Sequence, residues 1–158
     1  MHQHVPPHAR HASRPIRIVI ADDHTLFAEA LALAFKSDPR FEVVGLAENG
    51  REALALAASL HPDVVLMDLH MPVMDGIEAT RRLGVAAPGA RVVVVTASTS
   101  PEDSERARAA GALAYIRKWS SADELREAVE EAAADATAPL QASRSQGRWR
   151  PFPLLRSA

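Results

Sequence analysis

The sequence predicts a doubly wound α/β fold, in which five parallel strands form one sheet and five helices cover its two faces. Short apolar runs alternate with longer amphipathic stretches from Ile16 onward. Two of these runs, Val64–Asp68 and Arg91–Thr96, are almost continuously apolar and rich in β-branched residues, which is typical of central strands covered on both faces. Such β-α alternation indicates right-handed crossovers between parallel strands.

The elements follow one another in strict alternation. The predicted strands are Ile16–Ala21, Phe41–Ala47, Val64–Asp68, Arg91–Thr96 and Ala114–Arg117. The predicted helices are Thr25–Lys36, Gly50–Ser59, Gly76–Leu83, Pro101–Ala110 and Ala122–Ala134. The last helix has the clearest signature, because Ser121 can cap its first turn and Glu124 follows three residues later.

Both ends of the chain lie outside this pattern. Residues 1–14 contain four histidines and two prolines without a helical or strand period, and we expect a disordered arm. These histidines, His2, His4, His8 and His11, could bind a metal, but their irregular spacing favours a plain arm. Residues 135–158 form a basic, proline-containing tail that lacks the helical period of a helix-turn-helix module. We therefore expect one domain over residues 15–134, with a flexible tail and no DNA-binding output.

The composition is that of an ordinary globular protein. The 158 residues are 47% hydrophobic and 24% charged, and the net charge is -2. Cysteine is absent, which fits a reducing compartment, and no apolar run approaches the roughly 18 residues of a membrane span. We expect a cytoplasmic protein without membrane or nucleic-acid partners.

Polar residues stand where the predicted strands end. They are Asp22 and Asp23 after the first strand, Asp68 at the third, Thr96 at the fourth and Lys118 just after the fifth. In a doubly wound sheet, ligands bind beyond the carboxyl ends of the strands, so we expect these five side chains to form one cluster. Singly, each has an ordinary explanation as a helix cap, a strand end or a surface charge; their coincidence at corresponding positions favours a site.

The predicted cluster has a specific chemistry. Three neighbouring carboxylates repel one another unless a cation neutralises them, and Mg²⁺ prefers oxygen ligands of this kind. Asp68 could then act as a nucleophile that forms an acyl phosphate. Thr96 and Lys118 would supply a hydroxyl and an ammonium group to the oxygens of the transferred phosphoryl group.

The sequence resembles the receiver domain of two-component response regulators, the CheY-like family. The segments that carry the resemblance are IRIVIADDHTLF, DVVLMDLHMPVMDGIEATRRL, VVVVTAS and GALAYIRK, in order and at suitable separations. Within them, Pro72 and Gly76 shape the loop after Asp68 and allow the next helix to begin. The resemblance implies a flavodoxin-like sheet with strand order 2-1-3-4-5.

The resemblance also implies roles for individual residues. Asp68 would accept a phosphoryl group from a phosphohistidine on a sensor histidine kinase or a phosphotransfer protein. Asp23 and Asp68 would bind Mg²⁺, Asp22 would assist through water, and His70 would contribute its main-chain carbonyl. Thr96 would move toward the phosphoryl group.

Tyr115, three residues before Lys118, would swing inward and report the change on the face formed by the fourth helix, fifth strand and fifth helix. An unidentified downstream protein would bind that face, and the family allows a homodimer that forms on phosphorylation. An ordinary half-buried aromatic is the alternative explanation for Tyr115.

Two residues depart from the family pattern. Many relatives have proline after the lysine, with a cis bond, whereas Trp119 follows Lys118 here. A cis bond before a non-proline residue costs about 2.5–4 kcal/mol, so we expect a trans peptide. His70 occupies a position that varies in the family and tunes the lifetime of the phosphoryl group; the sequence does not give the direction of its effect.

We expect a receiver that catalyses only its own phosphorylation and dephosphorylation and is otherwise not an enzyme. Two other functions are alternatives to this one. A haloacid-dehalogenase-like phosphatase also uses an aspartyl phosphate, but its nucleophile belongs to a D-x-D pattern on the first strand. The adjacent pair Asp22-Asp23 and the later Asp68 fit that pattern badly. A pseudo-receiver would bind partners without phosphorylation, yet every acceptor-site residue is present.

Overall fold

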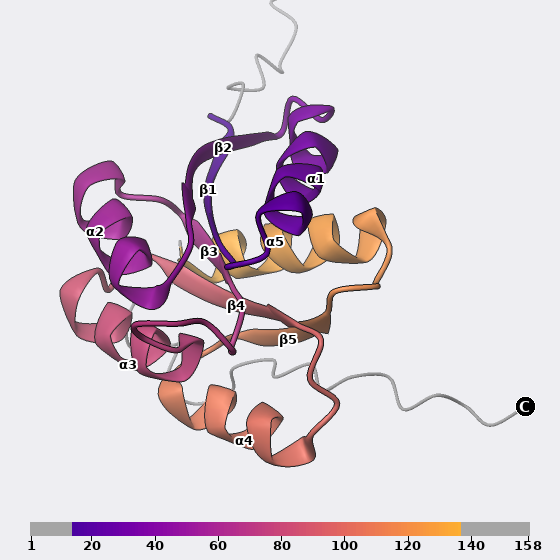
Figure 1. Cartoon of the computed structure of the whole chain (residues 1–158). Helices are drawn as coiled ribbons and strands as arrows, with labels where there is room; N and C mark the ends of the chain where they lie inside the picture. The colour runs from indigo at the N-terminus through magenta and orange to yellow at the C-terminus, as the bar shows by residue number, and fades with distance from the viewer. Residues whose placement is uncertain (1–13, 137–158) are drawn as a thin grey trace, which may run out of the picture.

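The structure, a computed structural model, describes residues 14–136 and confirms the predicted architecture (Figure 1). Five parallel strands are paired in the order β2-β1-β3-β4-β5. The strands are β1 (Ile16–Ala21), β2 (Phe41–Ala47), β3 (Val64–Met67), β4 (Arg91–Thr96) and β5 (Ala114–Arg117). The helices are α1 (Thr25–Lys36), α2 (Gly50–Leu60), α3 (Gly76–Ala86), α4 (Pro101–Ala110) and α5 (Ala122–Ala136).

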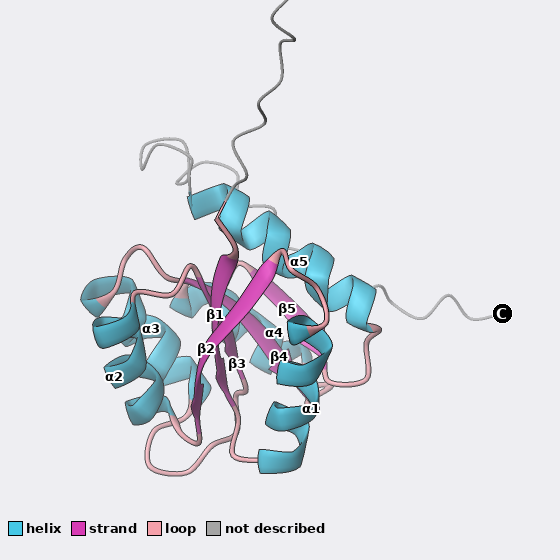
Figure 2. Cartoon of the chain, turned by 90° about the horizontal axis from the view of Figure 1, so that it is seen from above, coloured by secondary structure: helices cyan, strands magenta, loops and turns pink. Residues whose placement is uncertain are grey.

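The sheet separates two apolar layers. Figure 2 shows α2 and α3 on one side of the strands and α1 and α5 on the other. Successive residues of β3 face opposite layers: Val65 packs in the cluster that includes α2, α3 and α4, whereas Val64 and Leu66 pack in the cluster that includes α1 and α5. This alternation on a strand buried on both faces explains why β3 is apolar at every position.

Local side-chain caps determine where several helices begin. Asn49 accepts a hydrogen bond from the Glu52 N–H at the start of α2, and Asp75 accepts one from the Glu78 N–H at the start of α3. At α5 the predicted reciprocal pair is present: the Glu124 N–H donates to Ser121 Oγ, and the Ser121 N–H donates to Glu124 Oε2, both at 3.2 Å.

Most predicted boundaries agree with the structure, and the differences lie at element ends. Strand β3 ends at Met67 rather than Asp68, because the chain turns there and the Leu69 N–H donates to Asp68 Oδ1 at 2.8 Å. Helix α3 continues to Ala86 rather than Leu83. One exposed glycine, Gly84, costs about 1 kcal/mol in a helix and does not stop it here.

The two predicted terminal segments fall largely outside the described residues. Of the predicted arm, Arg14 is described, and its guanidinium donates to both carboxylate oxygens of Asp63 at 2.8 and 3.0 Å. Of the predicted tail, residues 135–136 continue α5. Within residues 14–136, no helix combines the length and apolar character needed to cross a bilayer.

Candidate functional site

Parallel pairing brings the ends of β1, β3, β4 and β5 to one edge of the sheet. Ala21 lies opposite Met67, so Asp22 and Asp68 leave neighbouring strands at the same level. The Asp68 N–H donates to the Ala21 carbonyl at 2.9 Å, and the Lys118 N–H donates to the Thr96 carbonyl at 3.0 Å. These backbone bonds extend the ladders by one residue and hold the predicted site residues side by side.

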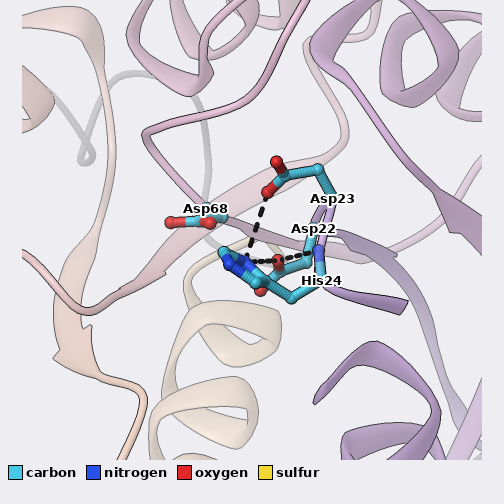
Figure 3. A group of neighbouring side chains, drawn as sticks. All are labelled: Asp22, Asp23, His24 and Asp68. Atoms are coloured by element: carbon cyan, nitrogen blue, oxygen red, sulfur yellow. Dashed lines mark hydrogen bonds and ion pairs between the residues drawn. The ribbon is translucent and has the colours of Figure 1, made fainter. Parts of the chain in front are cut away.

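The carboxylates predicted to gather do so. Asp22, Asp23 and Asp68 each offer an oxygen, and His24 offers a ring nitrogen, such that all four atoms lie within 4.8 Å of one another (Figure 3). Asp22 and Asp68 are buried, whereas Asp23 and His24 are exposed. The group therefore has a buried floor and an open rim.

Lys118 lies against the buried floor of this acidic group. Its Nζ is 2.7 Å from Asp22 Oδ2 and 3.1 Å from Asp68 Oδ2. Burial raises the pKa of Asp68, and the charge of Asp22 raises it further, although Lys118 opposes both effects. Burial lowers the pKa of Lys118, but the hydrogen bond to Asp22 and the charge of Asp68 outweigh burial and raise the pKa overall.

Thr96 and Tyr115 meet at the loop after β4. The hydroxyl of Thr96, a fully buried residue, accepts a hydrogen bond from the Ser98 N–H at 3.2 Å. The ring of Tyr115 is buried, and its hydroxyl donates to the Ser98 carbonyl at 3.4 Å. Tyr115 thus points inward in this structure, and both predicted switch residues contact the backbone of Ser98.

His70 lies on the rim beside α4. Its side chain is exposed, and its Nε2 is 3.3 Å from Asp103 Oδ2. The same Asp103 oxygen accepts a hydrogen bond from Ser98 Oγ at 2.6 Å. Asp103 therefore connects the loop after β3 to the loop after β4.

His24 was missed as a site residue by sequence reasoning. Its Nδ1 lies 3.1 Å from Asp22 Oδ1, 3.3 Å from Asp23 Oδ1 and 3.2 Å from Lys118 Nζ. Its position directly after the two aspartates was the available signal. The expected trans peptide after Lys118 is confirmed, since residues 14–136 contain no cis bond.

Comparison with known proteins identifies the arrangement. The family model of the response regulator receiver domain matches residues 18–130. The chain belongs to this family. It is a two-component receiver of the CheY-like type, and the family match includes Asp22, Asp23, Asp68, Thr96 and Lys118.

Individual relatives differ in what accompanies the receiver. The chain is 38% identical over 117 residues to the transcriptional regulatory protein LiaR of Bacillus subtilis (strain 168). The match covers 74% of this chain and 56% of LiaR. The chain is also 42% identical over 114 residues to protein-glutamate methylesterase/protein-glutamine glutaminase 2 of Anaeromyxobacter dehalogenans (strain 2CP-C). This match covers 72% of this chain and 33% of that protein. The chain thus matches about a third to a half of these relatives.

One solved structure of a receiver domain matches this fold over the whole length of the solved domain. The response regulator domain of Thermotoga maritima CheB has a TM-score of 0.71 and 31% sequence identity, and the match covers 80% of this chain and 100% of that domain. The flavodoxin-like order predicted from the sequence is therefore confirmed both by the strand pairing and by the similarity to a known receiver.

Proposed function

We propose that this receiver is switched by phosphorylation of Asp68 in the presence of Mg²⁺. The observation that carries the proposal is the meeting of two buried carboxylates with one ammonium group, Lys118 lying 2.7 Å from Asp22 and 3.1 Å from Asp68. One ammonium leaves the three carboxylates of the site with excess negative charge, which a divalent cation would neutralise.

The residues present fit Mg²⁺. Asp22, Asp23 and Asp68 supply hard oxygen donors within reach of one ion, and the exposed rim leaves room for water ligands. Asp23 and Asp68 would hold the ion directly, Asp22 would act through water, and the His70 carbonyl would complete the protein ligands. When bound, Mg²⁺ supplies positive charge to the phosphoryl oxygens.

The donor would be a phosphohistidine of a sensor kinase or a phosphotransfer protein. An oxygen of Asp68 forms a bond to phosphorus as the nitrogen–phosphorus bond of the donor breaks, and the electron pair of that bond returns to the imidazole. Lys118, which already contacts Asp68, would pair with a phosphoryl oxygen. Thr96 would turn its hydroxyl toward another.

The response would appear on the face formed by α4, β5 and α5. Thr96 and Tyr115 both contact Ser98, and Ser98 contacts Asp103 on α4, so a displaced Thr96 has a path of hydrogen bonds to this face. A downstream protein, or a second copy of this chain, would bind the altered face. Amide exchange in α4, β5 and α5 should change on addition of beryllofluoride with Mg²⁺, and unchanged exchange would contradict this output.

The decisive experiment is incubation with acetyl phosphate and Mg²⁺, followed by intact-mass measurement. Wild type should gain the mass of one phosphoryl group, and Asp68→Asn should not. Asp123→Asn removes a carboxylate whose side chain is 94% exposed on α5 and should behave as wild type. An equal mass gain in Asp68→Asn would overturn the proposal.

The alternative of a phosphatase is tested in the same preparation. Turnover of small phosphomonoesters would favour it, whereas a receiver should show only its own phosphorylation and slow dephosphorylation.

We propose that the phosphorylation of Asp68 takes place in the cytoplasm and requires only the domain formed by residues 15–134. Deleting residues 139–158 should then leave the mass gain intact.

A further inference from the structure

One ring nitrogen of His24 lies close to two hydrogen-bond acceptors and to one hydrogen-bond donor, and it cannot form hydrogen bonds with all three at once. Figure 3 shows dashed lines from the ring to Asp22 and to Asp23, whose carboxylate oxygens lie 3.1 and 3.3 Å from its Nδ1. The same nitrogen is 3.2 Å from the Lys118 ammonium. A ring nitrogen donates when protonated and accepts when bare. It therefore cannot donate to the carboxylates and accept from Lys118 at the same time.

A divalent cation would resolve this conflict. Metal–ligand distances of about 2.1 Å place neighbouring ligands of an octahedron roughly 3.0 Å apart. The separation of Nδ1 from the oxygen of Asp23, a proposed direct ligand, is 3.3 Å and close to that value. An ion held by Asp23, with Asp22 acting through water, would attract the bare nitrogen, so that the ring would no longer need a proton donor such as the Lys118 ammonium.

The backbone presents His24 for this contact. Its own N–H donates to Asp22 Oδ1 at 2.8 Å, which holds the residue beside the acids. Its side chain is 69% exposed and makes no hydrogen bond that caps α1, although the residue occupies the N-cap position. The side chain therefore has no capping role in the fold, and its ring contacts the residues of the acidic group instead.

A nitrogen donor changes which metal such a site prefers. Carboxylate and carbonyl oxygens suit Mg²⁺, whereas imidazole suits later first-row metals such as Ni²⁺ and Zn²⁺. We propose that His24 is a metal-selectivity residue, which adds a nitrogen ligand to the acidic group and strengthens its binding of an octahedral transition-metal ion relative to Mg²⁺. The inference rests on the proposed metal site of the receiver and extends it to the identity of the ion.

The test measures the affinity of the full chain for Ni²⁺ and for Mg²⁺ by calorimetry. All samples carry His2→Ala, His4→Ala, His8→Ala and His11→Ala, so that the N-terminal histidines contribute no Ni²⁺ binding. His24→Phe keeps an aromatic ring without a nitrogen, and His24→Ala removes the ring. His61→Asn is the matched control, because this histidine lies at the far end of α2 with φ of 48°, a conformation that asparagine tolerates.

The expected result is a change in selectivity. Both His24 variants should weaken Ni²⁺ binding by about tenfold or more while the Mg²⁺ affinity changes by less than about threefold, as expected for the loss of a nitrogen ligand. His61→Asn should leave both affinities unchanged. Equal Ni²⁺ affinity in the His24→Phe variant, or a loss seen in His70→Ala instead, would overturn the inference.

Failure of the inference is distinguishable from failure of the proposed function. If Mg²⁺ binds and Asp68 gains a phosphoryl group while the His24 variants keep the Ni²⁺ preference, His24 has no selectivity role and the receiver function stands. If neither ion binds the chain, the proposed metal site itself is wrong, and the inference falls with it.

Discussion

Gly76 packs directly against the backbone of Asp68. A Cβ atom at Gly76 would lie 1.9 Å from the Asp68 carbonyl oxygen and 2.8 Å from its carbonyl carbon. The Gly76 N–H also donates to the Leu69 carbonyl at 2.8 Å. The first residue of α3 therefore needs to be glycine, because the backbone of Asp68 occupies the space that a side chain would take.

The variant Gly76→Ala should be destabilised by about 2–4 kcal/mol, since backbone atoms have to move to make room. Urea unfolding measures the change. Gly84→Ala is the matched control within the same helix, because a Cβ there meets no atom within 4 Å. It should gain up to about 1 kcal/mol from the higher helix propensity of alanine. Equal stability of the two variants would refute the packing argument.

Val73, in the loop after Asp68, has an unfavourable backbone conformation for a β-branched residue. Its φ is 68°, and its side chain is 74% exposed, so little packing compensates for the strain. Val73→Gly should raise the free energy of unfolding by about 1 kcal/mol. Val85→Gly removes a comparable side chain, in a residue that is 87% exposed, from α3 and should lower it by about 0.3 kcal/mol. A loss of stability in Val73→Gly would contradict this.

Asp68 should make the metal-free protein less stable as pH rises. The pKa of its carboxyl is raised above the ordinary value of 3.8, mainly by burial and then by Asp22. Between 3.8 and the raised value, the folded chain binds more protons than the unfolded chain, so stability falls with increasing pH in that interval. The stability of Asp68→Asn relative to wild type should therefore increase as the pH rises from the ordinary value of 3.8 through the raised pKa of Asp68.

Thermal unfolding in the presence of a chelator measures this difference. Under the proposed function, addition of Mg²⁺ should then stabilise wild type more than Asp68→Asn, because the ion would bind the ionised carboxylate of the folded state. A stability difference that is constant or shrinks with pH would show that burial and Asp22 do not dominate the environment of Asp68.

Asp103 should hold the loop after β4 in its present conformation. It accepts the 2.6 Å hydrogen bond from Ser98 Oγ and lies 3.3 Å from His70 Nε2. Asp103→Ala leaves the Ser98 hydroxyl without this partner and should cost about 1–2 kcal/mol. Amide exchange should accelerate in residues 97–104, as local opening becomes easier. Glu102→Ala, an exposed neighbour in the same turn, should leave exchange there unchanged.

Local sequence patterns were sufficient to predict most of the fold. The β-branched run at Val92–Val95 predicted a central strand, and the pair Ser121 and Glu124 predicted the start of α5, since both signals act between near neighbours. The end of α3 was predicted too early at Leu83. One glycine at position 84 is a weak helix breaker, and the helix continues past it to Ala86.

The sequence by itself determined the order of strands and helices, the polar residues at the strand ends and the receiver family. Only the tertiary structure decided that His24 joins the acidic group, that His70 faces Asp103 and that Tyr115 lies inward. Elements form from interactions within a few residues, whereas the contacts of His24 with Lys118, of His70 with Asp103 and of Tyr115 with Ser98 join segments that are distant in the sequence. They depend on parallel register and side-chain rotation, which no local pattern specifies.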